Sequence, residues 1–131
     1  MSPIADNLSN TAENRALDWL CGLPATAPTT PLKVALVTAA GSDTAAGTEV
    51  TGGSYARKNL TVSAAVSGGT SNSADLLWTG MPACTVVGWE VWDSAGVPVR
   101  IWHGPITEGS RVCVAGDELR ISAGGLTLSM S

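Results

Sequence analysis

The side chains that most often carry out chemistry are few in this chain. His103 is the one histidine among 131 residues, and it lies in the run Trp-His-Gly-Pro. A Ser–His–Asp hydrolase needs such a histidine beside a nucleophilic serine, yet the chain contains no Gly-x-Ser-x-Gly motif. A histidine that follows the last aromatic residue of a strand is typical of a turn. We therefore expect no catalytic site at His103.

The three cysteines do not have the spacing of a metal site. Cys21, Cys84 and Cys113 are far apart in the sequence and form no Cys-x-x-Cys pair. Structural zinc sites draw their ligands from close-spaced pairs, so a Cys₃His set with His103 is not predicted, and we expect no metal or cofactor. Small buried thiols are the usual role of free cysteines. An odd number leaves one thiol unpaired, and Cys21 is the candidate for a disulfide to another subunit.

The acidic and aromatic residues also lack a clear catalytic arrangement. A glycosidase needs two facing carboxylates in a cleft, whereas Asp93 and Asp117 both occur in turn sequences. A carbohydrate-binding module would need two or more tryptophans on one solvent-exposed face. Trp89 and Trp92 are three residues apart in a predicted strand and therefore point to opposite faces. We expect one of them in the core and the other at an interface, where tryptophan is enriched.

The composition excludes several classes of protein. Charged residues make up 14% of the chain and hydrophobic residues 44%, whereas ordinary globular proteins carry about a quarter charged residues. Such a chain is not a disordered tail. Seven basic against eleven acidic residues argue against nucleic-acid binding, and no apolar run approaches the length of a membrane span. A surface poor in Lys and Glu loses little side-chain entropy when a partner covers it, which favours a role in an assembly.

The first part of the chain predicts one helix of about four turns within residues 6–21. Asp6, Asn7 or Ser9 could cap its start, Gly22 has the position of a left-handed C′ residue, and the Pro-rich segment 24–31 is an extended connector. The apolar residues at helical spacing are Leu8, Ala12, Ala16, Trp19 and Leu20.

The rest of the chain predicts about eight short strands separated by turns. Residues 32–38 are apolar on both sides, which predicts a central strand, and residues 93–96 predict a hairpin turn. The pattern indicates an all-β fold, a β-sandwich or jelly roll, over residues 32–131, after an N-terminal helical arm and connector over residues 1–31. The predicted strands are 32–38, 59–66, 76–79, 84–92, 97–102, 112–114, 119–122 and 126–130.

Three segments carry a resemblance to a known family. Residues 47–57 read GTEVTGGSYAR after a strand LKVALVT, residues 87–96 read VGWEVWDSAG, and residues 116–128 read GDELRISAGGLTL. In these segments the chain resembles small virion proteins of tailed bacteriophages, which are described as tail-fibre-like or minor structural proteins. The resemblance covers residues 6 to 130. The Trp-rich hairpin departs from the family pattern, which has more Phe and Ile there.

The resemblance implies a non-enzymatic structural protein of the phage virion, assembled in the cytoplasm of the bacterial host. We favour a capsid decoration (cement) protein that binds and stabilises the assembled coat, and a trimer as its homo-oligomer. The alternative is a protein of the tail fibre or baseplate, and a more distant one is a carbohydrate-binding module. The implied partners are other virion proteins, either the major capsid protein or tail proteins, and neither nucleic acid nor a membrane.

Two sets of residues are expected to matter for these roles. Arg57 is expected to pair with Glu49 across the loop, and Tyr55 to pack at the base of the same loop with its hydroxyl bonded. These three form a structural loop rather than a receptor site. The interface candidates are Leu8, Trp19, Leu20, Trp89, Trp92 and Trp102.

Overall fold

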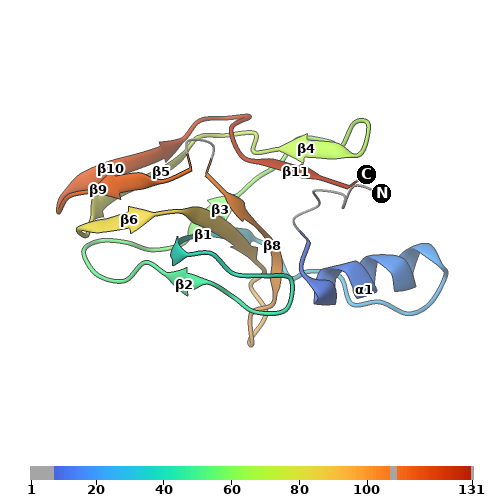
Figure 1. The fold of residues 1–131 in the computed structure, drawn as a ribbon. Helices are drawn as coiled ribbons and strands as arrows, with labels where there is room; N and C mark the ends of the chain where they lie inside the picture. The colour runs from blue at the N-terminus through green and yellow to red at the C-terminus, as the bar shows by residue number, and fades with distance from the viewer. Residues whose placement is uncertain (1–7, 107–108, 131) are drawn as a thin grey trace.

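A computed structural model of the chain describes residues 8–106 and 109–130 (Figure 1). This part of the chain contains one helix and several antiparallel sheets, which confirms the expected all-β class with an N-terminal helix. The elements are α1 (Asn10–Leu20), β1 (Leu32–Ala39), β2 (Thr48–Glu49), β3 (Lys58–Leu60), β4 (Gly69–Ser71), β5 (Leu76–Met81), β6 (Cys84–Val86), β7 (Gly88–Trp92), β8 (Arg100–Pro105), β9 (Arg111–Cys113), β10 (Asp117–Ile121) and β11 (Thr127–Ser129).

Strand β1 is the centre of the main sheet. It pairs with β7 on one side and with β2 and β3 on the other, and β7 then pairs with the edge strand β8. Its residues 34–37 are all buried. A strand that is covered on both faces needs apolar side chains in both directions, as the sequence of β1 predicts.

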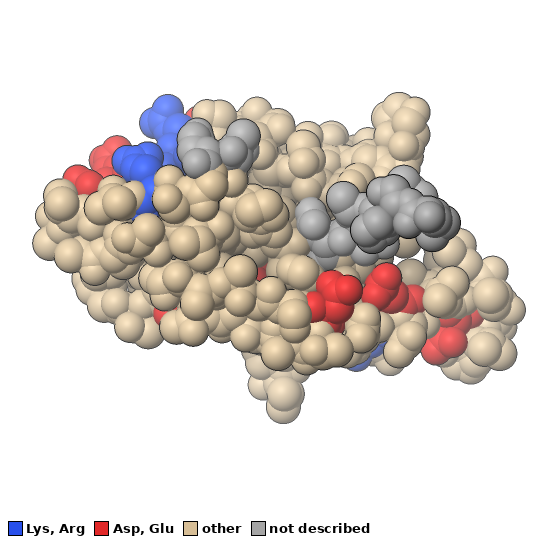
Figure 2. All heavy atoms as spheres, in the orientation of Figure 1, with Lys and Arg blue, Asp and Glu red and all other residues tan. Residues whose placement is uncertain are grey.

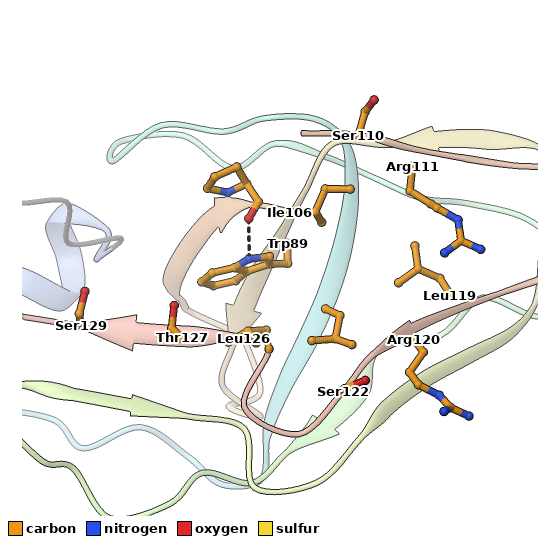
Figure 3. A pocket seen from close by; sticks show the side chains of 13 residues that line it. Trp89, Ile106, Ser110, Arg111, Leu119, Arg120, Ser122, Leu126, Thr127 and Ser129 are labelled. Carbon is orange, nitrogen blue, oxygen red and sulfur yellow. Dashed lines mark hydrogen bonds between the residues drawn. The ribbon is translucent and has the colours of Figure 1, made fainter. Parts of the chain in front are cut away.

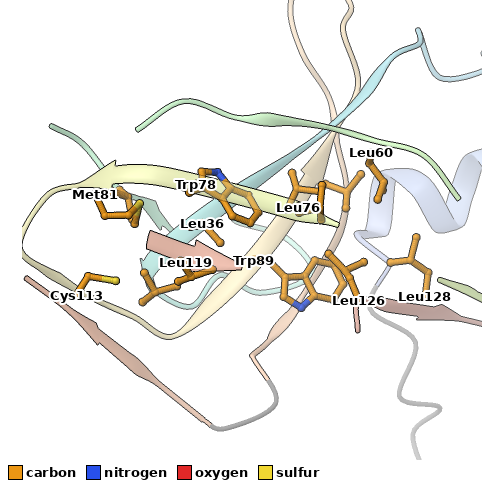
Figure 4. Close-up of a cluster of buried hydrophobic side chains, with 14 residues drawn as sticks. Leu36, Leu60, Leu76, Trp78, Met81, Trp89, Cys113, Leu119, Leu126 and Leu128 are labelled. Carbon is orange, nitrogen blue, oxygen red and sulfur yellow. The ribbon is translucent and has the colours of Figure 1, made fainter. Parts of the chain in front are cut away.

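The core lies between this sheet and three smaller antiparallel pairs, β10–β5, β11–β4 and β6–β9. Leu36 and Trp89 reach into it from the main sheet, while Trp78, Leu119 and Leu128 reach into it from β5, β10 and β11 (Figure 4). Side chains from two facing layers thus fill one interior, as in a sandwich.

The long predicted strand 84–92 is divided in two. At Val87 the backbone N–H donates to the Val37 carbonyl at 2.9 Å, so the chain passes from the β6–β9 pair into the main sheet. The predicted strand 59–66 is likewise regular only in β3, with isolated bridges at Val62 and Val66. The short strands β2 and β4 lie in segments that the sequence analysis did not predict as strands. These segments are rich in Gly, Ser and Thr, which are typical of turns.

Helix α1 is shorter at its start than predicted. Leu8 forms a β-bridge with Trp102 on β8, and Ser9 then caps the helix by accepting the Ala12 N–H at 3.2 Å. The other candidate caps, Asp6 and Asn7, lie outside the described residues. At the C-terminal end Gly22 has a φ of 81°, and the residues around it form the hydrogen bonds of a Schellman motif.

The start of α1 and the end of the connector both contact the β-sheet. Leu8 and Ala12 pack with Ile101, and the backbone N–H of Thr29 donates to the Asp93 carboxylate. Every residue from 21 to 31 is exposed. Figure 1 accordingly shows α1 standing out to one side of the strands.

Candidate functional site

The long loop after β1 is closed by a cluster of three polar side chains. Arg57 donates twice to the Glu49 carboxylate, from Nη2 at 2.8 Å and from Nε at 3.0 Å. The Tyr55 hydroxyl donates to the same carboxylate at 2.7 Å and accepts the backbone N–H of Leu36 at 2.9 Å. The structure therefore brings Glu49, Tyr55 and Arg57 together at the edge of β1. We call these three residues the loop clamp.

The charges in the loop clamp reinforce one another. Burial opposes the ionisation of Glu49, but the hydrogen bonds from Arg57 and Tyr55 and the charge of Arg57 outweigh it and lower its pKa. Burial and the hydrogen bond to Glu49 raise the pKa of Tyr55. Arg57 also stacks on Trp92, with its guanidinium carbon 4.6 Å from the ring centroid. The clamp is thus a scaffold in which both oxygens of the Glu49 carboxylate are paired with Arg57 and one of them also with Tyr55.

The Tyr55→Phe substitution should lower the free energy of unfolding by about 1–3 kcal/mol, because it leaves the Leu36 N–H without the hydroxyl that accepts it. Urea unfolding measures this change. Thr51→Val, which removes an exposed hydroxyl from the same loop, is the control and should change the stability by less than about 0.5 kcal/mol. Equal effects of the two substitutions would contradict the role given to Tyr55.

A buried ion pair holds the earlier part of the same loop. Glu90 on β7 is 2% exposed and accepts from Arg100 on β8 at 3.3 Å. Glu90 also accepts the Gly47 N–H at 2.7 Å, and Arg100 donates to the Ser42 carbonyl. The sequence interpretation missed this pair, although one acidic residue within the apolar run VGWEVW is an unusual feature that could have drawn attention to it.

His103 lies within strand β8 opposite Glu90, so the turn predicted from its sequence context is wrong; the strand continues to Pro105 because it pairs with β7. The His103 Nε2 lies 2.8 Å from Oδ1 of Asp43, whose side chain is about half exposed on the loop after β1. The contact joins this loop to the edge strand β8. Within the described residues, no group of three His, Cys, Asp or Glu side chains is arranged to hold a metal ion.

Asp93 and Asp117 have the turn roles that their sequence contexts indicate. Asp93 accepts the backbone N–H groups of Thr29, Ala95 and Val99, and Asp117 accepts that of Val114 at 2.9 Å. Burial alone would raise the pKa of Asp93, but the three backbone hydrogen bonds outweigh it and lower the pKa. Asp93 therefore anchors both the β7–β8 hairpin and the connector.

Acid should destabilise the protein through Glu49 and Asp93. Both have lowered pKa values in the folded state, so their stabilising contributions are complete above the ordinary values of 4.5 and 3.8 and are lost as the pH falls through the folded values. The urea midpoint should therefore decline below about pH 4.5. Asp93→Asn should flatten this decline, and an unchanged pH profile in that variant would contradict the assignment.

The five tryptophans lie in different environments. Trp78 and Trp89 are buried in the core, and Trp92 lies partly buried under Arg57. Trp102 packs against the small cluster of Leu8, Ala12 and Ile101 beside the helix. Trp19 alone is exposed, at 71%. The exposed pair of tryptophans that a carbohydrate-binding module would need is therefore not formed.

An open groove of about 750 Å³ lies between β10 and the end of β8 (Figure 3). Trp89 forms part of its wall, with its Nε1 donating to the Pro105 carbonyl at 3.1 Å. Arg111 and Arg120 lie at its rim with their side chains exposed. The groove has mixed polarity and no paired carboxylates of the kind a glycosidase requires.

Four large apolar side chains are exposed on the last turns of α1 and just after its end. The side chains of Leu17, Trp19, Leu20 and Leu23 are 58–71% exposed. We call these four residues together the arm surface; they surround the end of the helix rather than share one face, because Leu17 and Trp19 are two positions apart on α1. Beside them, a groove of about 520 Å³ runs between α1 and the connector, and Ala12, Ile101 and Trp102 contribute to its walls. Figure 2 shows that most of the visible face is uncharged, with acidic side chains on the side that carries α1.

The interface candidates thus separate into two groups. Trp19 and Leu20 belong to the arm surface, whereas Leu8 and Trp89 are buried within the chain. The remaining two, Trp92 and Trp102, are partly covered by other side chains of the chain.

A family model matches most of the chain. Residues 7–129 match the family described as Podophage GP4 fiber I protein gp80. The chain belongs to this family of phage fibre proteins. The match extends over α1 and all the strands, and no curated protein matches the chain.

Membership in the fibre family supports the predicted phage virion class. It favours association with other virion proteins and a location in the virion. In the described residues, no helix of this fibre-family chain is long and apolar enough to cross a membrane. Cys21, the candidate for a disulfide to another subunit, is exposed at the end of α1 next to Leu20, and its pairing stays a prediction.

Proposed function

We propose that this chain is a non-enzymatic structural subunit of the phage fibre, held in the virion by its arm surface. The observation that carries this proposal is the exposure of Leu17, Trp19 and Leu20 on a helix to one side of the strands, and of Leu23 just after it. The fibre family supports the location. Other virion proteins are the partners, and the chain assembles in the host cytoplasm.

The energetic reason is the burial of apolar area. Fully covering one large apolar side chain is worth about 1.5–3 kcal/mol, so covering four half-exposed ones contributes several kcal/mol before the cost of association is subtracted. The low fraction of charged side chains reduces the entropy lost at the contact. A trimer of this chain is the homo-oligomer we favour, with the arm surface at the contact between subunits.

Capsid decoration is the second candidate. Its support is the composition, because a surface rich in small residues and poor in charge suits close contact with coat subunits. A decoration protein that binds only the assembled shell stabilises it by mass action. We place this role after the fibre because the matched family is one of fibre proteins.

Labelling of intact virions tests the location. Gold-labelled antibodies against the β-strand region should bind along the fibres in negatively stained particles. Particles that lack this chain are the control for specificity. Gold over the capsid shell would favour decoration instead, and absence of the chain from purified virions would overturn the proposed virion role.

A further inference from the structure

Two of the three cysteines face each other across a pair of antiparallel strands. Cys84 on β6 and Cys113 on β9 are direct partners in the register, followed by Thr85 with Val112. Directly opposed residues in antiparallel strands have Cα atoms about 4.5–5.5 Å apart. A disulfide needs Cα atoms about 4.4–6.8 Å apart, so this register position places the two thiols where a bond can close without moving the strands.

The two thiols also lie on the same face of the pair. Cys113 is 2% exposed in the main core, and Cys84 is partly buried and packs against the same core. The next pair in the register, Thr85 and Val112, points to the opposite face of the strands, and both of these residues are exposed. Burial and the neighbouring Cys113 thiol raise the pKa of Cys84. Because Cys84 is more accessible than the buried Cys113, an oxidant reaches the Cys84 thiol first, and the Cys113 thiol then closes the disulfide.

We propose that Cys84 and Cys113 form an intrachain disulfide across β6 and β9 when the protein meets a low-molecular-weight disulfide such as glutathione disulfide. The thiolate of Cys84 attacks one sulfur of glutathione disulfide and releases one glutathione thiolate. The thiolate of Cys113 then attacks the Cys84 sulfur and releases the second. Two cysteine thiols are oxidised, one disulfide is reduced to two glutathiones, and the two protons pass to the released thiolates or to water.

The bond would add a covalent link to one of the short strand pairs of the fold. The β6–β9 pair has three residues in each strand, and the closed loop contains both β7 and β8 of the main sheet. Closing a loop of about 30 residues restricts the unfolded chain strongly, which corresponds to a rise in Tm of about 10 °C. The host cytoplasm keeps thiols reduced, so the bond forms after the protein leaves the cell. This inference does not depend on whether the chain lies in the fibre or on the capsid.

The test uses the full chain with Cys21→Ser, which removes the exposed thiol and leaves the pair. The reduced protein is treated with glutathione disulfide, unfolded, and alkylated with iodoacetamide. We expect the intact mass to show no alkylation and the loss of two hydrogens. Trypsin without reductant should release the peptide 59–100 joined to the peptide 112–120. The Tm should rise by about 10 °C and return after treatment with dithiothreitol.

The matched control is Cys84→Ser in the same background. Oxidation should leave its Cys113 open to alkylation after unfolding and its Tm unchanged. Because the reduced and oxidised forms of the same Cys21→Ser chain are compared, the change in its Tm does not depend on how well the Cys84→Ser control folds. Two alkylated cysteines after treatment, or a separate glutathione on each, would overturn the proposal.

Discussion

Replacing Leu17 and Trp19 by serine should remove this protein from assembled virions without unfolding it. Both side chains are at least 60% exposed in the isolated chain, so their loss takes little from its own core. If a neighbouring subunit covers them, each substitution removes about 1.5–3 kcal/mol from the contact. Incorporation into virions should then fall at least about tenfold, the equivalent of 1.4 kcal/mol.

Quantitative blotting of purified particles against a coat protein measures this incorporation. The matched control is Val66→Ser with Val112→Ser, because these apolar side chains are equally exposed but lie on the strand region. The control should be incorporated normally, and both double variants should keep the Tm of the parent chain within a few degrees. Normal incorporation of the Leu17 and Trp19 variant would contradict the role of the arm surface.

Among single substitutions, Glu90→Gln should cause one of the largest losses of stability. The Glu90 carboxylate is the partner of Arg100, which is 7% exposed, and it also accepts the Gly47 N–H and the Trp92 Nε1–H. Removing its charge leaves a buried guanidinium without compensation, which costs about 3–5 kcal/mol in comparable cases.

Urea unfolding measures this loss, and Glu118→Gln on an exposed position of β10 is the control, expected within about 0.5 kcal/mol of the parent chain. Hydrogen exchange should also become faster at the Gly47 amide, since the Glu90 carboxylate accepts the hydrogen bond of its N–H. A loss below about 1 kcal/mol for Glu90→Gln would show that the pair does not stabilise the fold.

The sequence predicted the elements whose patterns are local. Apolar residues on both sides of 32–38 predicted the buried central strand, and Ser9 and Gly22 marked the ends of α1. The opposite directions of Trp89 and Trp92 follow from the period of a strand. These features depend on neighbours within a few residues, and a single sequence contains that information.

The sequence could not predict features that depend on pairing between distant strands. The division of 84–92 at Val87 is caused by its hydrogen bond to Val37, and the Glu90–Arg100 pair depends on the register of β7 and β8. The opposition of Cys84 and Cys113 depends on the register of β6 and β9. The sequence also does not show that Leu8 is buried by other residues of the chain whereas Trp19 is left exposed, although both were interface candidates.

The most direct test of the account is a cryo-EM reconstruction of the intact virion in which the fibre subunits are traced. We predict density for this chain in the fibre, with Leu17, Trp19 and Leu20 of α1 and the following Leu23 buried against a neighbouring subunit. Density for the chain with these four side chains still facing solvent would contradict the account, as would its placement on the capsid shell.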